Sequence, residues 1–181
     1  MKKTIYFLAI FITITVFLTA TICNAQPYGK GLYNADVPYG GQTSLSISTD
    51  GGINIPTNPA TGGALSTGTS IVTVTSTDVK GYKLYIRAQT NTSLVKSGAT
   101  IAASANGSAA PLATNTWGYN VNDASSNFIG ITLTDVQIRS LTGPARTGDV
   151  TNIKYGVNLD LTKPIGTYST DIVYTAVPQT D

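Results

Sequence analysis

Hydrophobic and polar residues alternate in short segments through most of the chain after residue 42. In residues 43–49, Leu45 and Ile47 alternate with serine, and in residues 81–89 four apolar or aromatic side chains alternate with other residues. A period of two is typical of a β-strand with one buried face. No segment after residue 25 shows a sustained helical period. The pattern therefore predicts an all-β protein.

Glycine, proline, asparagine and aspartate separate the predicted strands. The segments that alternate are residues 43–49, 70–75, 81–89, 127–134, 150–161 and 166–177. Lys163-Pro164-Ile165-Gly166 joins the last two, and such a sequence is typical of a turn, so we expect them to form an antiparallel hairpin. Residues 57–68 and 102–113 are rich in small side chains and are predicted to be long loops.

Eight to ten short strands of this kind predict a single antiparallel β-sandwich of the immunoglobulin-like or jelly-roll type. The alternation leaves one polar face on each sheet, as expected when two sheets pack only through their inner faces. A closed β-barrel is the alternative. The sandwich is expected to span residues 43–181.

The first 25 residues have the pattern of a secretory signal peptide, an N-terminal helix that is cleaved on export. Lys2 and Lys3 precede an apolar and threonine-rich run over residues 5–22, which ends at Cys23-Asn24-Ala25. The small residues at this end favour cleavage after Ala25. A transmembrane anchor is the alternative, because about 18 apolar residues are marginally enough to span a bilayer. After cleavage we expect a secreted protein with no integral membrane span.

Residues 26–42 differ from the segments on either side. Their sequence, QPYGKGLYNADVPYGGQ, combines glycine and proline with three tyrosines and lacks sustained alternation. Such a composition predicts an N-terminal arm, or a lead-in along a sheet edge, rather than part of the core.

The composition of the mature chain excludes most catalytic chemistry. The 181 residues contain no histidine and no glutamate, and the single cysteine, Cys23, lies in the signal peptide. Histidine acid/base catalysis, thiol nucleophiles and His/Cys zinc sites are therefore excluded. Asp50, Asp123 and Asp149 are predicted in turns and Asp171 on an outward strand face. We expect no enzyme activity, no metal and no cofactor.

The charge balance argues against a nucleic-acid partner. Removal of residues 1–25 leaves nine lysines and arginines against nine aspartates. Nucleic-acid binding normally depends on an excess of basic residues on one face, and none is visible here.

Aromatic residues are the strongest candidates for a binding surface. Trp117 and Tyr119 are two residues apart, so their rings are expected to share one strand face. Such rings stack on sugars or anchor protein interfaces. The alternative is that Trp117 fills the core of the sandwich. Tyr82 and Tyr174 lie on inward faces of predicted strands, which favours packing over direct ligand contact.

Two segments carry a resemblance to a known family. They are IVTVTSTDVKGYKLYIRA, with Tyr82 and Leu84, and IGTYSTDIVYTAVP, with Tyr168 and Tyr174. Their spacing resembles the two signature segments of the WxL-type bacterial cell-surface domain. Tyr82 and Tyr174 stand where that family has tryptophan, and Ala176 stands where it has the second leucine. The resemblance implies a secreted bacterial protein held non-covalently on the cell wall, often beside other surface proteins.

The mature chain also resembles uncharacterised secreted proteins of reduced-genome, surface-living bacteria. The shared phrases are NADVPYGGQTSLSIS, ATNTWGYN and TAVPQT. Those proteins have no known activity, so this second resemblance does not indicate one for this chain.

Three functions remain open from the sequence. The first is a non-enzymatic secreted cell-surface protein that associates non-covalently with a cell-wall polymer or with other surface proteins. The second is a subunit of a surface fibre or an adhesin that assembles by β-strand addition. The third is a secreted glycan-active enzyme.

Overall fold

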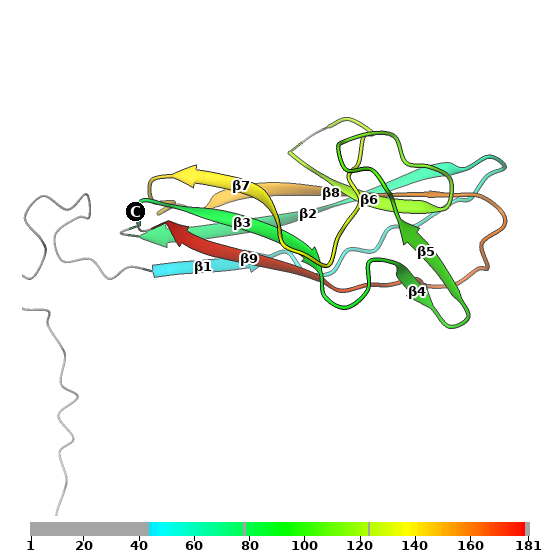
Figure 1. Ribbon diagram of the computed structural model, residues 1–181, viewed down its shortest axis with the longest axis horizontal. Coiled ribbons are helices and arrows are strands. Elements are labelled where there is room, and N and C mark those ends of the chain that lie inside the picture. The colour runs from blue at the N-terminus through cyan, green and yellow to red at the C-terminus, as the bar shows by residue number, and fades with distance from the viewer. Residues whose placement is uncertain (1–43, 78, 123, 180–181) are drawn as a thin grey trace, which may run out of the picture. The chain divides into compact units, whose positions relative to one another are not determined.

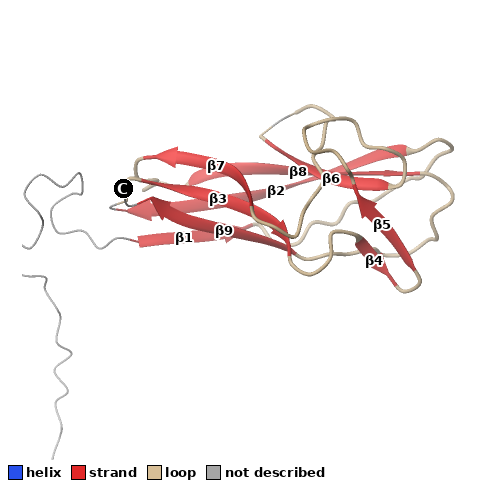
Figure 2. Ribbon diagram, in the orientation of Figure 1, coloured by secondary structure: helices blue, strands red, loops and turns tan. Residues whose placement is uncertain are grey.

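Nine β-strands make up the regular structure of this chain in the computed structural model, which describes residues 44–77, 79–122 and 124–179. Within these residues there is no helix (Figure 2), which confirms the all-β prediction. The predicted signal peptide, residues 1–25, and the predicted arm, residues 26–42, lie outside the described residues.

The strands form two sheets that face each other (Figure 1). The larger sheet has the order β1 (Ser44–Thr49), β2 (Ala64–Thr77), β8 (Asp149–Leu159), β6 (Thr116–Val121), β5 (Ala99–Ala103) and β4 (Leu94–Lys96). The smaller sheet has the order β7 (Val136–Thr142), β3 (Gly81–Ala88) and β9 (Ile172–Gln179). This arrangement is sandwich-like. The pairing is antiparallel except between β5 and β6, which are parallel, so the prediction of a wholly antiparallel sandwich is wrong at that pair.

The core lies between the inner faces of the two sheets. In β3 the four alternating residues predicted to share a face, Tyr82, Leu84, Ile86 and Ala88, are all fully buried. Opposite them, the inner face of the larger sheet carries Val72, Val74, Ile153, Tyr155, Val157 and Leu159, all buried. The period of two therefore identified the buried face of β2 and β3, whose other face is largely open, and of β8, whose outward positions Lys154 and Asn158 are polar and half-buried.

The predicted hairpin of residues 150–161 and 166–177 is wrong. Strand β8 lies between β2 and β6, and β9 pairs with β3 in the other sheet. Residues 160–171 cross from one sheet to the other instead of turning back. Both edges of β8 are already used, by eleven paired positions with β2 and six with β6, so no edge is free for β9.

Three further segments differ from the sequence predictions. Strand β2 begins at Ala64, inside the loop predicted over residues 57–68, and β5 overlaps the loop predicted over 102–113. The predicted strand 127–134 contributes only isolated bridges at Phe128 and Ile129, and Leu133 is exposed. No strand was bounded at β4, β6 or β7, although Trp117 and Tyr119 of β6 were expected to share one strand face.

The outer face of β6 and β8 is also covered. Phe128 is fully buried there, and a Cβ built on Gly156 of β8 would lie 2.4–2.8 Å from three carbons of its ring. A Cβ on Gly118 of β6 would meet the carbonyl oxygen of Ile129 at 2.5 Å. Glycine is thus required at both positions because the 128–129 backbone and the Phe128 ring lie directly on the sheet. Asn106 fixes this cover by donating to the Phe128 carbonyl at 3.1 Å.

We predict that Gly156→Ala destabilises the fold by about 1–3 kcal/mol, because the added methyl group overpacks the site of the Phe128 ring. Gly107→Ala is the matched control, since a Cβ there meets nothing within 4 Å. Chemical denaturation of residues 26–181 measures both. An equal free energy of unfolding for the two variants would contradict the packing of Phe128 on β8.

Candidate functional site

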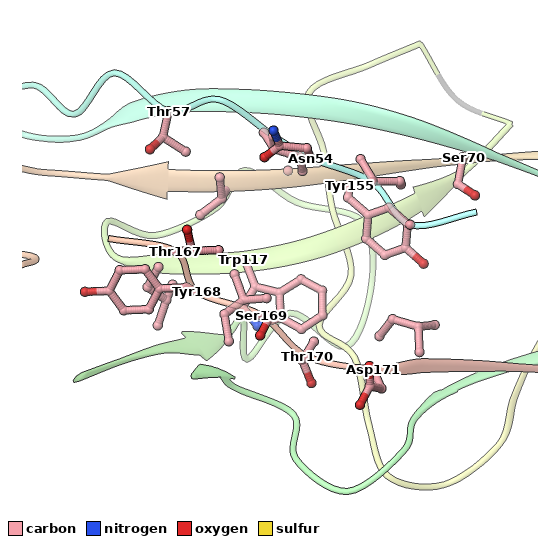
Figure 3. Close-up of a pocket in the computed structure, with 18 of the residues that line it drawn as sticks. Asn54, Thr57, Ser70, Trp117, Tyr155, Thr167, Tyr168, Ser169, Thr170 and Asp171 are labelled. Carbon is pink, nitrogen blue, oxygen red and sulfur yellow. The ribbon is translucent and has the colours of Figure 1, made fainter. Parts of the chain in front are cut away.

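A groove of about 1080 Å³ opens over the part of the larger sheet that the smaller sheet leaves uncovered. One wall is residues 51–57, which continue from the end of β1, and the other is residues 166–172, which lead into β9. Figure 3 shows Asn54 and Thr57 on one side and Tyr168, Ser169, Thr170 and Asp171 on the other. Strands β1 and β9 lie side by side without pairing, so the groove is the place where their two edges separate (Figure 1).

The floor of the groove is apolar and aromatic. It contains Trp117 of β6 and Tyr155 of β8, whose rings stack with centroids 6.3 Å apart and an interplanar angle of 28°. The indole N–H of Trp117 donates to the carbonyl of Thr92 at 2.9 Å, which fixes the ring. Val157 and Leu159 extend the floor along β8. These residues come from alternate positions of paired strands, which point to the same face of the sheet.

The 166–172 wall is held in place on one side only. Ser169 exchanges two backbone hydrogen bonds with Val95 of β4, at 2.8 and 3.0 Å. Neighbouring residues of an extended strand direct their backbone groups to opposite sides, so those of Tyr168 and Thr170 face away from β4. Within the described part of the chain these groups have no hydrogen-bond partner. The side chains are fixed, since the Tyr168 hydroxyl donates to Pro164 at 2.8 Å and Lys96 lies over its ring.

The 51–57 wall is anchored by its side chains. Ile53 and Ile55 pack against Gly68 of β2, where a Cβ would meet them at 2.8 and 2.9 Å. No hydrogen bond among the described residues involves the backbone of residues 51–57. Both walls of the groove therefore present unpaired backbone N–H and C=O groups, which is the property of a free sheet edge.

Hydroxyl groups cluster where the groove meets the closed part of the sandwich. The hydroxyls of Tyr155 and Tyr174 are hydrogen-bonded at 2.5 Å, and Ser70 donates to Asp50 at 2.7 Å. Burial is the main cause that raises the pKa of both tyrosines, whereas the hydrogen bond from Ser70 lowers the pKa of Asp50. At neutral pH the tyrosines are neutral and the cluster carries one negative charge, on the exposed carboxylate of Asp50.

The structure places both candidate aromatic residues of β6 in the interior. Trp117 is 3% exposed and Tyr119 is 1% exposed, so neither forms an open stacking platform. Trp117 still borders the groove, whereas Tyr119 does not. Among the described residues, the buried hydroxyl of Tyr119 has no hydrogen-bond partner.

The four residues of the WxL-like segments lie in different places. Leu84 is a fully buried core residue, and Tyr82 is buried beside it on β3. Tyr174 is half-buried on β9 and lines the groove. Tyr168 was predicted on the same strand as Tyr174, but it lies in the connection before β9 and forms part of the groove wall. The structure thus brings Tyr168 and Tyr174 to one site and leaves Tyr82 and Leu84 outside it.

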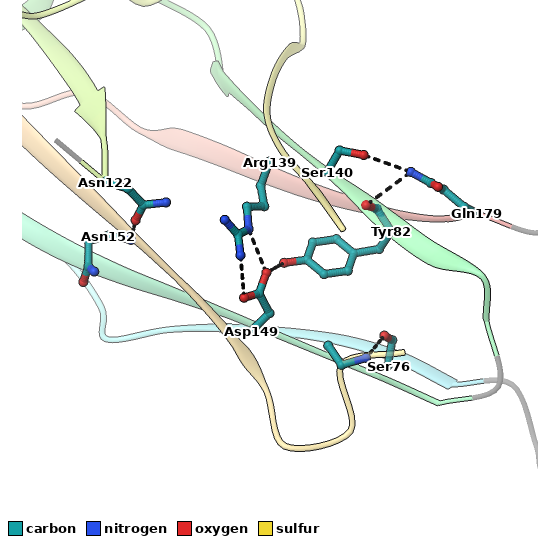
Figure 4. Close-up of polar contacts among 9 residues, drawn as sticks. Ser76, Tyr82, Asn122, Arg139, Ser140, Asp149, Asn152 and Gln179 are labelled. Atoms are coloured by element: carbon teal, nitrogen blue, oxygen red, sulfur yellow. Dashed lines mark hydrogen bonds and ion pairs between the residues drawn. The ribbon is translucent and has the colours of Figure 1, made fainter. Parts of the chain in front are cut away.

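Tyr82 belongs to a polar cluster away from the groove (Figure 4). Its hydroxyl donates to the Asp149 carboxylate at 2.5 Å, and Arg139 of β7 donates two hydrogen bonds to the same carboxylate at 2.8 Å. Arg139 holds the pKa of Asp149 below its usual value, while burial together with the Asp149 hydrogen bond raises the pKa of Tyr82 to about 12. The prediction that Asp149 serves as a turn residue is therefore wrong: it opens β8 and ties the two sheets together.

The remaining predicted acids are placed as follows. Asp50 follows β1, and Asp171 is exposed one residue before β9, not within a strand. Asp123 lies outside the described residues, but its neighbour Asn120 is buried in β6 and donates to the carbonyls of Ser125 and Asn127. Over residues 44–77, 79–122 and 124–179, no group of three or more acidic or cysteine side chains is arranged to hold a metal ion. The same residues contain no helix long and apolar enough to cross a membrane.

The sequence reasoning missed most of the groove. Ile53, Asn54, Ile55, Ser169 and Thr170 line it, and none of them was a candidate. The segment GGINIPTNP does carry a signal, because alternate isoleucines followed by proline are typical of an extended segment that continues no further as a paired strand.

No protein-family model matches the chain, and neither a curated protein nor a solved structure matches it. The two resemblances drawn from the sequence therefore stay predictions.

We predict that Asp149→Asn lowers the free energy of unfolding at pH 6 by about 1.5–3 kcal/mol, the range for hydrogen bonds to charged groups. A carboxylate with a lowered pKa stabilises the fold above its usual value of 3.8 and loses this effect as the pH falls through its folded pKa. The difference between parent and variant should therefore shrink below pH 4.

Asp135→Asn serves as the control, because the Arg87–Asp135 pair is 3.4 Å long and the Asp135 side chain is 51% exposed, against 18% for Asp149. Its effect should stay below about 1 kcal/mol at every pH. Denaturation curves at pH 6 and pH 3 make the comparison, and equal effects of the two substitutions would show that the Asp149 cluster does not tie the sheets.

Proposed function

We propose that the chain is a secreted, non-enzymatic bacterial cell-surface protein that associates non-covalently with a cell-wall polymer or with other surface proteins. We also propose that its two sheets form an immunoglobulin-like or jelly-roll sandwich related to the WxL-type domains. The signal-peptide pattern of residues 1–25 supports export. The groove supports the binding role, and it is the observation on which the proposal depends.

The chemistry of the groove favours a neutral, extended ligand. Its rim carries amide and hydroxyl groups from Asn54, Thr57, Ser169 and Thr170, over an aromatic and apolar floor. Aromatic rings with neutral hydrogen-bonding groups around them are the usual elements that recognise a sugar ring or an uncharged peptide. A cavity of this volume is as large as those that bind small ligands, and its exposed walls leave room for a polymer to enter and leave.

The same chemistry favours binding over reaction. Of the described residues that line the groove, Asp171 alone carries a carboxylate, and glycoside hydrolysis normally uses two on opposite sides of the bond. The neighbouring tyrosines have raised pKa values and are neutral, so they do not supply a base at neutral pH. A secreted glycan-active enzyme therefore has no specific support from the groove.

A surface-fibre subunit or strand-addition adhesin is the second candidate function. One observation favours it specifically: both walls of the groove have unpaired backbone edges. Strand addition requires such edges, because main-chain hydrogen bonds supply its affinity.

We predict that Tyr168→Ala weakens the binding of residues 26–181 to purified cell-wall sacculi about tenfold, or about 1.4 kcal/mol, because it removes an aromatic wall of the groove. Tyr85→Ala is the matched control, since Tyr85 is also half-buried but lies on the outer face of β3. Sedimentation with sacculi gives both affinities. Equal binding by the two variants, or no saturable binding by the parent, would contradict attachment through the groove.

A further inference from the structure

We propose that the groove receives one extended strand from a second copy of this chain, and that the strand is Tyr33-Asn34-Ala35-Asp36-Val37. This inference deepens the second candidate function, assembly by strand addition, and it depends on that function. It names the partner and the segment that would occupy the groove between residues 51–57 and 166–172.

The groove has the form of a missing strand. At the end of the molecule that holds the groove, the larger sheet is extended beyond β4 by Ser169, whose backbone groups pair with those of Val95. On the other side, residues 51–57 continue from β1. In the part of the chain that the structure describes, the paired backbone ends at Ser169 on one side of the groove, and residues 51–57, which pack on β2 through Ile53 and Ile55 but have no backbone partner, form the other side. A single strand placed there meets a free edge on each side and an apolar floor below it.

The inner residues beside the groove show the same deficiency. Ile172 and Tyr174 of β9 face the core, yet each is only half-buried, while their partners on β3, Ala88 and Ile86, are fully buried. Ile47 of β1 faces the same way as its fully buried partner Val74 and is 39% exposed. The core is thus complete along β3. It is incomplete along β9 and along β1, the two strands whose edges separate to form the groove.

Residues 33–37 have the pattern that such a strand requires. Tyr33, Ala35 and Val37 alternate with Asn34 and Asp36, so one face is apolar and the other polar. A strand in the groove would place the first set on the floor with Trp117 and Tyr155, and the second set toward solvent. The stretch is short, but the walls of the groove, residues 51–57 and 166–172, are only seven residues long each.

The connection to Ser44 favours a second copy over the same chain. Six residues, 38–43, separate Val37 from Ser44, and the seven steps from one Cα to the other span at most about 25 Å when the chain is extended. Ser44 begins β1 at the end of the strand far from the groove (Figure 1). To reach its own groove, the segment would have to reverse and follow the edge of β1, where β9 already lies. A neighbour joined head to tail brings its groove to the end where Ser44 lies, and such contacts generate open filaments.

The experiment uses the absence of cysteine from residues 26–181, so that introduced cysteines form the only disulfides. Asn34→Cys, on the solvent-facing side of the proposed strand, and Asn54→Cys, on the rim of the groove, are made in separate proteins, mixed and oxidised. We expect at least fivefold more mixed disulfide dimer than with Lys83→Cys, a control on the exposed outer face of β3. Equal yields with Asn54→Cys and Lys83→Cys would overturn the proposal.

The double variant Asn34→Cys/Asn54→Cys separates the two possible donors, a second copy and the same chain. We expect a ladder of linked chains on a non-reducing gel. A monomer with an internal disulfide would overturn the proposal, because it would show that the chain fills its own groove.

A pair of charge substitutions tests the same contact without disulfides. Ala35→Asp places a charge on the apolar face and is expected to weaken self-association at least tenfold in analytical ultracentrifugation. Asn34→Asp adds the same charge on the polar face and should change it less than twofold. Equal effects, or a parent that stays monomeric at every concentration, would contradict the proposal.

These measurements contain no cell wall, so they can fail independently of the sacculus experiment. Self-association without binding to sacculi would leave the strand exchange standing and refute wall attachment. Binding to sacculi by a protein that never self-associates would refute the strand exchange and leave wall attachment standing.

Discussion

The structure depends on one mismatch of length between its two sheets. The central strands of the larger sheet, β2 and β8, have 14 and 11 residues, whereas the strands of the smaller sheet have 7 or 8. The inner face of the larger sheet is mainly apolar, with Ser70, Ser76 and Thr151 buried among its apolar residues, and exposure of its apolar area costs about 25 cal/mol per Å². Irregular segments must therefore cover what the smaller sheet does not reach, and the groove is the gap between them.

Glycine and tyrosine provide two different solutions to this need for cover. On the outer face, Gly118 and Gly156 let the 128–129 backbone and the Phe128 ring lie directly on β6 and β8. On the inner face, the buried Tyr155 and the half-buried Tyr174 pair their hydroxyls with each other, so that neither of these two phenols lacks a partner. At the opposite end the Tyr82–Asp149–Arg139 cluster holds the two sheets together. The groove is therefore bounded by fixed elements, and its walls are the least constrained part of the site.

The sequence predicts the strands whose faces differ most and fails where both faces are alike. Tyr82 to Ala88 alternate because one side is buried and the other is open, and Ile153 to Leu159 alternate because Lys154 and Asn158 occupy half-buried outward positions. Strand β6 is buried on both faces, so Trp117 to Asn120 show no alternation, and no strand bounds were predicted there beyond the expectation that Trp117 and Tyr119 share a face. The hairpin error at residues 150–177 has another cause: turn residues mark where a strand ends, but not which distant strand it then joins. The groove combines residues 51–57 with 166–172, and no local pattern relates segments that far apart. For the same reason the partnership of Asp149 with Tyr82 was not predictable from spacing.

The central claim is that the groove has two free backbone edges over a closed aromatic floor. Amide hydrogen exchange of residues 26–181, measured by NMR at a concentration where the protein is monomeric, tests it most directly. The account predicts fast exchange for the amides of Ile53, Ile55, Tyr168 and Thr170, and slow exchange for their neighbours Val95 and Ser169 and for Tyr155 on the floor. Equal protection of Ser169, Tyr168 and Thr170 in the monomer would contradict it, because it would mean that the groove is already filled.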